Sequence, residues 1–547
     1  MVRSCCPLFL LCALIALSCG CVGELGQRAL EPSDDDDAPP ATSNDRAFST
    51  SPGIRRLTQI EYKKSVEFLT GVDAGPLNVP REFIQSHHSQ IAGAQKVGYA
   101  DVERFALVAQ EIAQARTDAL LDAAGCGPDD ASCTKQWAEA FLTLAWRGAD
   151  APGSRARYLG LLELERAGDS VRQRAQTFVA AALCSPYFLY RTEIGASEGA
   201  SGEVVELTGA EIATRMSYLV WQSTPDRELL EQAQQGALGT PSGRLEALER
   251  MMRDPRAVDG ARAFVADWMG VFGPSLNTKD AEVLQGTDRS LPEEAQRSFE
   301  MSVDQLITQQ QGGYLELLAT DEVFVTPQIA TIMGVAYDGS QGEFQQAKLP
   351  EHRLGLLTHP VVLAAHTKES GASPFPIGAF IYENILCETI PVFENIPDEA
   401  EGVDEQALTL RQRLEARTQG QPCAACHVKI GPSGFSFLPF DPIGRYSATD
   451  ALDRPYDTTG EVPVGAGEST IAFGDQTDLA RSLAAHPKAA QCVADRLFRW
   501  THGRYEGSSD AGELGALREL SVSSMSDSGE LLRALVSSAS FTQARHR

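Results

Sequence analysis

The sequence predicts a mainly α-helical protein of several modules, with at most a short β-hairpin. Apolar residues recur at helical spacing through most of the chain after residue 54. Two Thr-x-x-Glu capping boxes, Thr58 to Glu61 and Thr208 to Glu211, each mark the start of a helix. Residues 456–473, an apolar run interrupted by glycines, are the clearest candidate for the hairpin. Helical patterns cover residues 100–123, 134–147, 155–183, 244–270, 292–318, 403–417, 477–502 and 528–543.

Length and turn-rich breaks divide the chain into modules. At about 150 residues per domain, 547 residues allow three to four domains. Turn-forming and polar residues gather at 195–202, 337–345 and 394–401. We expect five modules after the N-terminal region, at residues 54–125, 126–197, 203–336, 346–450 and 456–547.

The overall charge excludes several classes of partner. The chain has 74 acidic and 47 basic residues, which gives a formal net charge of −27. A protein this acidic lacks the phosphate attraction that drives non-specific nucleic-acid binding. We therefore expect no nucleic acid and no acidic lipid surface as a partner.

The first 21 residues have the form of a lipoprotein-type signal peptide. Arg3 precedes an apolar run of about eleven residues, which suits a secretory signal and is too short to span a bilayer. Small residues follow and end at Cys19, the expected lipidation site, with Cys21 as the alternative. An ordinary cleaved signal is the other interpretation.

Residues 22–53 are rich in Asp, Ser and Pro and almost lack large apolar side chains, so we expect a disordered stalk there. Together with the signal, this predicts an exported protein, a periplasmic or outer-membrane lipoprotein of a Gram-negative bacterium. Its contact with the membrane would be the N-terminal lipid anchor.

Residues 423–427, Cys-Ala-Ala-Cys-His, form the one C-x-x-C-H motif of the chain, the attachment sequence of c-type haem. Two cysteines on one helical turn can add to the two vinyl groups of haem, and the next residue then lies under the iron. Random placement of twelve Cys and nine His gives roughly 0.004 such motifs. We predict one covalent haem c, held by Cys423 and Cys426, with His427 as the proximal ligand.

The residues after the motif suit a loop that approaches a macrocycle closely. Gly and Pro form turns there, and aromatic side chains such as Phe435 can cover the ring. Arg445 or Tyr446 is expected to hold a propionate. Ordinary core packing is the other interpretation of the aromatic residues.

The distal position of the haem has several candidates. No methionine lies between His427 and Met525, so the usual downstream Met ligand is not expected. An open sixth position is one alternative. The candidate distal ligands are His359, His366, His486 and His502.

The motif also has two interpretations without haem. Cys423 and Cys426 could form a structural or redox disulfide, although a thioredoxin-like pair would need a βαβ context. They could instead be half of a zinc site completed by Cys387 and Cys492.

The remaining cysteines suggest disulfides, as export would allow. Cys126 and Cys133 are close enough in sequence to close a short loop. Cys387 and Cys492 form a second, long-range candidate pair. Cys184 lies in an apolar helical segment and is expected to be a buried thiol.

Phrases such as RLTQIEY at 56–62, SPYFLYR at 185–191 and GLLTHP at 355–360 recur in a known pattern. Together with the C-x-x-C-H motif, they resemble a secreted multi-module family abundant in planctomycetes and myxobacteria. The family consists of consecutive domains of unknown function, of the 1587, 1595, 1592, 1588 and 1585 types, around a cytochrome-c-like module. The resemblance covers nearly the whole chain after residue 54 and implies that residues 346–450 form the haem module, without implying a substrate. The matching phrases are RLTQIEY at 56–62, SPYFLYR at 185–191, SYLVWQSTPD at 217–226, Asp254-Pro255-Arg256 with Trp268, GLLTHP at 355–360, CAACH at 423–427 with GRY at 444–446, and WTHGR at 500–504.

Three functions fit these features. The first is single-electron transfer or redox sensing at the cell envelope, with an unknown redox partner protein. The second is a haem-dependent oxidoreductase that acts on an exported polymer or a small molecule. The third is a non-catalytic surface adaptor whose cysteine pair is structural. The sequence singles out no catalytic residues, so whether the protein is an enzyme stays open at this point.

Overall fold

The structure, a computed structural model, describes residues 53–545 except for internal segments. These are 76, 86–87, 93–94, 96, 149–151, 165–167, 196–203, 274, 306–311, 341, 372, 392–407, 421 and 468. The predicted signal peptide with Cys19 and Cys21, and residues 22–52 of the predicted stalk, lie outside the described residues.

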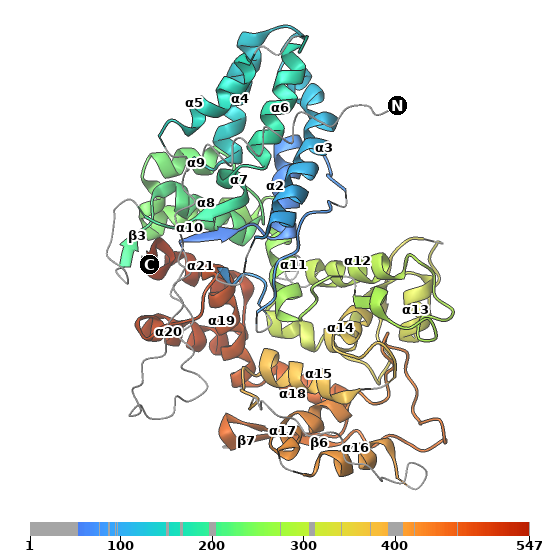
Figure 1. Ribbon diagram of the computed structural model, residues 1–547. Coiled ribbons are helices and arrows are strands. Elements are labelled where there is room, and N and C mark those ends of the chain that lie inside the picture. Colours follow the sequence, from blue (N-terminus) through green and yellow to red (C-terminus); the bar gives the residue numbers. More distant parts are fainter. Residues whose placement is uncertain are drawn as a thin grey trace, which may run out of the picture.

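Residues 54–192 form a helical unit, seen at the top of Figure 1. Thr58 caps its first helix: its hydroxyl accepts from the backbone N–H of Glu61, and the Glu61 carboxylate accepts from the backbone N–H of Thr58. The unit contains β1 (Ile54–Arg56), α2 (Gln59–Thr70), α3 (Tyr99–Ala123), α4 (Ala131–Ala145), α5 (Ser154–Leu159), the 3₁₀ helix η2 (Gly160–Glu163), α6 (Val171–Leu183), α7 (Pro186–Leu189) and β2 (Tyr190–Thr192).

The central segment begins with the second capping box, in which Thr208 and Glu211 cap each other as predicted. Its elements are β3 (Val204–Glu206), α8 (Gly209–Val220), α9 (Arg227–Gln234), η3 (Ala237–Gly239), α10 (Pro241–Met252), α11 (Ala257–Trp268), η4 (Ser275–Thr278), α12 (Leu291–Asp304), η6 (Tyr314–Leu318), β4 (Glu322–Val325), α13 (Pro327–Met333), β5 (Gln345–Lys348), η7 (Leu356–Thr358) and α14 (Pro360–Ala365).

The last segment carries the C-x-x-C-H motif at the start of α17, near the bottom of Figure 1. Its elements are α15 (Pro374–Phe380), the π-helix η8 (Ile381–Ile385), α16 (Leu410–Thr418), α17 (Cys423–Phe435), β6 (Gly460–Val464), η9 (Gly465–Gly467), β7 (Ser469–Phe473), α18 (Gln476–Ala484), α19 (Pro487–His502), η10 (Ser508–Asp510), α20 (Ala511–Ser523), α21 (Ser528–Ser537), η11 (Ser540–Thr542) and β8 (Gln543–Arg545).

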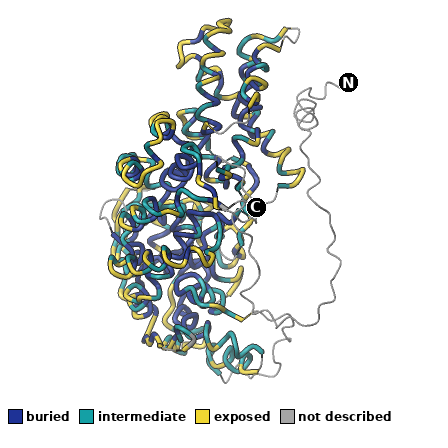
Figure 2. The backbone as a smooth tube through the Cα atoms, turned by 90° about the vertical axis from the view of Figure 1, so that its left-hand side faces the viewer, coloured by how far each residue is buried: buried dark blue, intermediate teal, exposed yellow. Residues whose placement is uncertain are grey.

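Buried apolar side chains fall into two clusters, which Figure 2 shows as dark blue stretches inside both parts of the molecule. The first cluster runs from Leu57 to Leu189 and includes Tyr218 of α8. The second runs from Val205 to Ala544, so the central segment and the C-terminal helices share one core. The five predicted module boundaries stay a prediction.

The prediction of a mainly helical protein is confirmed, but the prediction of at most one hairpin is wrong. The hairpin expected at 456–473 is present as β6 paired with β7. Three further two-stranded sheets pair β1 with β2, β3 with β8, and β4 with β5. β1, β2, β3 and β8 are three residues long and pair across large sequence separations, so no alternating pattern reveals them.

Several of the long predicted helices are interrupted. Residues 244–270 divide into α10 and α11, and residues 528–543 divide into α21, η11 and the first residue of β8. Residues 477–502 divide into α18 and α19 because His486 caps a new helix whose first residue is Pro487, where the missing N–H costs nothing. Residues 155–183 divide into α5, η2 and α6, and Ser170 caps the last of these. Within the described residues, no helix combines the length and apolar composition needed to cross a membrane.

Both predicted disulfides are present. Cys126 is bonded to Cys133 across the start of α4, and Cys387, two residues after the end of η8, is bonded to Cys492 of α19. Cys184 is half-buried and is not part of a disulfide. The long-range bridge fastens the segment before the C-x-x-C-H motif to the C-terminal helices.

We predict that the two bridges differ in their contribution to stability. Replacing Cys387 and Cys492 with Ala should lower the free energy of unfolding by about 5 kcal/mol, because the bridge restricts a 105-residue loop of the unfolded chain. Replacing Cys126 and Cys133 should cost only about 2 kcal/mol, because that loop spans 7 residues. Chemical denaturation without reductant measures both, with Cys184→Ala as the control. Equal losses would contradict the prediction.

Candidate functional site

The C-x-x-C-H motif occupies the first turn of α17. Cys423 is the first residue of the helix, directly after Pro422. Cys426 follows three residues later, so both sulfur-bearing side chains lie on the same side of the turn. His427 comes next on the helix. The spacing predicted from sequence is therefore realised on a regular helical turn.

Both cysteines of the motif are half-buried thiols that form no disulfide. The Cys426 Sγ lies 3.3 Å from the carbonyl oxygen of Pro391, to which it can donate. Burial raises the pKa of the Cys426 thiol, and nearby Lys429 opposes this shift. The thiol form is thus favoured at neutral pH.

His427 is half-buried and packs edge-on against Phe375 of α15, with 4.1 Å between the ring centroids. The imidazole makes no hydrogen bond within the described part of the chain, and its Nδ1 atom is fully buried. Burial lowers the pKa of His427, so the ring is neutral at physiological pH. A neutral imidazole without hydrogen-bond partners retains a nitrogen lone pair that can bind a metal.

Close backbone contact between α15 and α17 holds the motif in place. A Cβ atom at Gly378 would collide with the carbonyl oxygen of Ile430, and one at Gly434 would collide with the carbonyl oxygen of Pro374. Only glycine at these two positions lets the helices approach so closely. Phe435 is buried beside Phe375, at 6.1 Å between centroids, and completes the contact.

Phe435 therefore lies near the motif, but Arg445 and Tyr446 are engaged elsewhere. Arg445 donates to the carbonyl oxygens of Val283, at 2.7 Å, and Gln285, at 2.6 Å. Tyr446 stacks on His352, with 3.7 Å between ring centroids. Neither residue contacts His427 within the described structure.

His359 and His366 are buried in the central core. The Nδ1 atom of His359 accepts from the backbone N–H of Val361 at 3.4 Å, and its Nε2 atom lies 3.0 Å from the Ser298 hydroxyl. His366 donates from Nε2 to the carbonyl oxygen of Met269 at 2.7 Å and stacks on Phe380, with 3.8 Å between centroids. His366 and His427 thus contact α15 at positions five residues apart.

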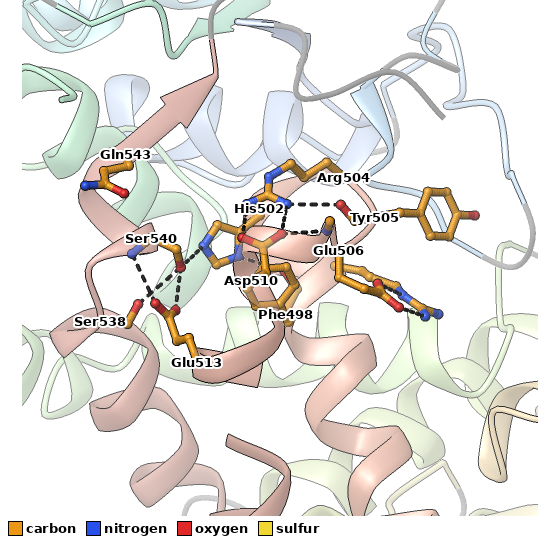
Figure 3. A network of polar contacts seen from close by, with 12 residues as sticks. Phe498, His502, Arg504, Tyr505, Glu506, Asp510, Glu513, Ser538, Ser540 and Gln543 are labelled. Carbon is orange, nitrogen blue, oxygen red and sulfur yellow. Dashed lines mark hydrogen bonds and ion pairs between the residues drawn. The ribbon is translucent and has the colours of Figure 1, made fainter. Parts of the chain in front are cut away.

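His486 and His502 lie at opposite ends of α19. His486 caps the start of the helix, where its Nδ1 accepts from the backbone N–H of Lys488 at 3.1 Å. His502 is buried at the end, and Figure 3 shows it between Phe498 and Ser540. Its Nδ1 donates to the Phe498 carbonyl oxygen at 2.9 Å, and its Nε2 lies 3.1 Å from the Ser540 hydroxyl.

Ser540, His502 and Glu513 form a cluster that the sequence did not reveal (Figure 3). It differs from a hydrolase triad because the Glu513 carboxylate accepts hydrogen bonds from Ser540 rather than from His502. Arg215 also binds the carbonyl oxygen of Ser540, at 3.1 Å. These contacts fasten the C-terminal strand to the core.

The described residues can be compared with two interpretations of the motif that do not involve haem, a zinc site and a thioredoxin-like redox pair. Cys387 and Cys492 are bonded to each other, so they cannot supply the second half of a zinc site. Among the described residues, no three His, Cys, Asp or Glu side chains gather as a metal-binding group. All four described sheets are antiparallel pairs, so they supply no βαβ unit for a thioredoxin-like pair.

Sequence reasoning missed the supports of the site. Phe375, Gly378 and Pro391 precede the motif by 32 or more residues in the chain, and only tertiary contacts, chiefly that of α15 with α17, bring them to it. A Pro-x-x-x-Gly pattern in α15 gives no signal of its own, because small residues in helices have many roles.

Two family models match consecutive parts of the chain. Residues 207–335 match PSD4, described as a protein of unknown function (DUF1592). Residues 353–450, which include α15, α16 and α17, match PSCyt3, described as a protein of unknown function (DUF1588). The chain carries consecutive domains of this multi-module type.

The matched ranges lie within the predicted modules 203–336 and 346–450. The motif and its supports therefore fall inside the PSCyt3 segment, while Cys492 and the C-terminal helices follow it. No curated protein and no solved structure matches the chain.

We predict that Gly434→Ala loosens the PSCyt3 segment. The added methyl group would collide with the Pro374 carbonyl oxygen, and the free energy of unfolding should fall by about 3 kcal/mol. Gly515→Ala, inside α20 with nothing nearby, is the matched control and should be neutral or stabilise by up to about 1 kcal/mol. Thermal and chemical denaturation measure both variants, and equal effects would contradict the contact.

We also predict that the protein loses stability in mild acid. Burial, aided by Arg353, lowers the pKa of His359 from 6.5 to about 3. Between those values the unfolded chain binds a proton that the folded chain does not, so stability falls as the pH drops. At pH 5 this costs about 2 kcal/mol. His359→Asn, which keeps a capping acceptor without titrating, should flatten the pH dependence of the unfolding free energy; an unchanged slope would refute the assignment.

Proposed function

We propose that this chain is an exported c-type haem protein that transfers single electrons or senses redox state at the cell envelope. One observation carries the proposal. Two unbridged thiols lie on one helical turn and are followed directly by an imidazole that makes no hydrogen bond in the described structure. This is the donor set that covalent haem attachment uses.

The state of the thiols favours haem attachment over a structural disulfide between Cys423 and Cys426. Two other pairs of cysteines, Cys126 with Cys133 and Cys387 with Cys492, form disulfides. In an oxidising compartment, thiols are seldom left unmodified. If the signal peptide exports the chain, thioether bonds to haem would explain why Cys423 and Cys426 form no disulfide.

The residues around the motif would define how haem is held. Cys423 and Cys426 would form its two thioether bonds, and His427 would be the proximal iron ligand. When bound, haem would supply one-electron redox chemistry at its iron. Phe375 fixes the plane of the His427 ring, and burial keeps that ring neutral, the form able to act as a ligand.

The flanking modules and the N-terminus would set the place of action. A lipid on Cys19, or on Cys21, would anchor the protein in the cell envelope, as a periplasmic or an outer-membrane lipoprotein. The helical modules would then bind an unidentified redox partner protein. The acidic surface, with a net charge of −27, favours a basic partner.

A haem-dependent oxidoreductase is the second candidate, and one observation favours it. Both nitrogens of His359 and of His502 are engaged in hydrogen bonds, and none of the four candidate histidines contacts His427 in the described structure. Because hydrogen bonds occupy both ring nitrogens of His359 and His502, neither residue has a nitrogen to offer as the sixth ligand, which favours an exchangeable sixth position. A surface adaptor with a structural cysteine pair is the third candidate.

The haem proposal is tested by expression with the c-type maturation machinery. The wild-type protein and Cys184→Ser should show a pyridine haemochrome spectrum with one haem per chain. Cys423→Ser/Cys426→Ser should lack covalent haem after acid–acetone extraction. A colourless wild-type protein that is folded by circular dichroism would overturn the proposal and leave the adaptor.

Carbon monoxide separates the two haem functions. Slow or absent binding to the reduced protein indicates a protein ligand at the sixth position and supports electron transfer. Rapid binding indicates an open position and supports the oxidoreductase. His427→Ala should keep its thioether bonds and change its visible spectrum, and an unchanged spectrum would show that another residue is the proximal ligand.

A further inference from the structure

The two ring nitrogens of His427 differ in their surroundings. Nδ1 is fully enclosed by protein and has no hydrogen-bond partner within the described residues. Nε2 makes no hydrogen bond there either, but it is not enclosed, so it is the nitrogen with room for a metal. In a neutral imidazole, a metal bound at one nitrogen leaves the proton on the other. Ligation through Nε2 therefore makes the Nδ1–H group a buried donor without an acceptor.

The side chains next to the imidazole supply no acceptor for this donor. The phenyl ring of Phe375 packs against His427 with 4.1 Å between the ring centroids, and it carries no oxygen or nitrogen. Position 431 lies one helical turn after His427 on the same face of α17. This position is occupied by a buried glycine, which has no side chain at all.

The space beside Gly431 borders the contact between Phe375 and His427. A Cβ atom at Gly431 would lie 3.9 Å from the Cε1 atom of Phe375 and 3.3 Å from the Cε2 atom of Phe435. Helix residues four apart have their Cβ atoms about 5–6 Å from each other. A short polar side chain at position 431 can therefore reach the imidazole ring, after a small shift of Phe435.

Backbone packing does not require glycine at position 431. The Cβ atoms of residues at 378 and 434 would collide with backbone carbonyl oxygens, at 2.0 Å in both cases. The nearest atoms to a Cβ at Gly431 belong instead to phenyl side chains, which can move. The helix contact between α15 and α17 thus explains Gly378 and Gly434, but it does not explain Gly431.

A hydrogen bond at the outer nitrogen of a ligating histidine tunes the metal. An acceptor for the Nδ1–H group makes the imidazole a more basic ligand, which stabilises the more positively charged ferric iron. Second-shell hydrogen bonding is accordingly one of the ways in which a protein sets the reduction potential of haem. His427 lacks such a hydrogen bond in the described structure.

We propose that Gly431 and Phe375 raise the reduction potential of the haem by withholding a hydrogen-bond acceptor from the Nδ1 atom of His427. The inference rests on the proposed haem function and deepens it, because it assigns two residues that tune the iron ligand without being ligands themselves. The site is thereby biased toward the ferrous state, and so toward accepting an electron.

A matched pair of substitutions at position 431 tests this role. Gly431→Ala and Gly431→Asn add the same Cβ atom beside Phe435, but only Asn adds an acceptor near Nδ1. In full-length holoprotein, Gly431→Asn should have a lower midpoint potential than Gly431→Ala. The expected difference is about a tenfold change in the ratio of ferrous to ferric protein, or about 59 mV for one electron. Gly431→Ala should keep the wild-type potential, and spectroelectrochemical titration measures all three proteins.

A second pair at position 375 tests the same role from α15. Phe375→Gln offers an amide oxygen to the imidazole, whereas Phe375→Leu keeps a large apolar side chain without an acceptor. Phe375→Gln should lower the midpoint potential in the same direction as Gly431→Asn, and Phe375→Leu should leave it close to that of the wild type. Visible spectra that match the wild type in each oxidation state show that the iron ligands are unchanged.

The outcomes separate this inference from the proposed function. Equal potentials within both pairs, in proteins that carry one covalent haem per chain, would overturn the inference and leave the haem proposal standing. Potentials lowered as much by Gly431→Ala and Phe375→Leu would also overturn it, since packing rather than hydrogen bonding would then set the potential. A wild-type protein without covalent haem would overturn the proposed function, and this inference with it.

Discussion

The backbone contact between α15 and α17 determines where the C-x-x-C-H motif lies. Gly378 and Gly434 allow the two helices to touch without intervening side chains, and this places Phe375 against His427. α15 continues into η8, where the side-chain amide of Asn384 donates to the carbonyl oxygen of Trp268 and accepts from Arg496 at 2.7 Å. The Cys387–Cys492 bridge adds a covalent link to α19. A small helical turn with reactive side chains is thereby fixed to the largest core of the protein.

Local signals in the sequence predicted local structure well. Thr58, Thr208 and their glutamates cap helices as expected, since a capping box needs only residues three apart. The two predicted disulfides, Cys126–Cys133 and Cys387–Cys492, are also confirmed. The sheet of β3 with β8 could not be predicted, because it joins residues 204–206 to 543–545 and each strand is too short to show a period. Arg445 was expected to hold a haem propionate, yet it donates to the backbone carbonyl oxygens of residues 283 and 285. No sequence pattern predicts this contact.

The candidate histidines illustrate the same limit. Composition cannot distinguish a ligand from a core histidine, whereas hydrogen bonds can. His359 and His502 each have both ring nitrogens engaged, and His366 is stacked and bonded to a carbonyl. Compared with the four candidate distal ligands, only the proposed proximal ligand, His427, makes no hydrogen bond within the described residues. Of these histidines, His427 is therefore the one that a bound metal would stabilise most, because its buried nitrogen has no other partner.

The central claim is that Cys423 and Cys426 are thioether-bonded to one haem. Mass spectrometry of the tryptic peptide from Thr418 to Lys429, which contains Cys423, Cys426 and His427, tests it most directly. Protein from a host with c-type maturation should be treated with iodoacetamide before digestion. The account predicts a peptide heavier by one haem and free of alkylation. A peptide alkylated at both cysteines, without added haem mass, would contradict it.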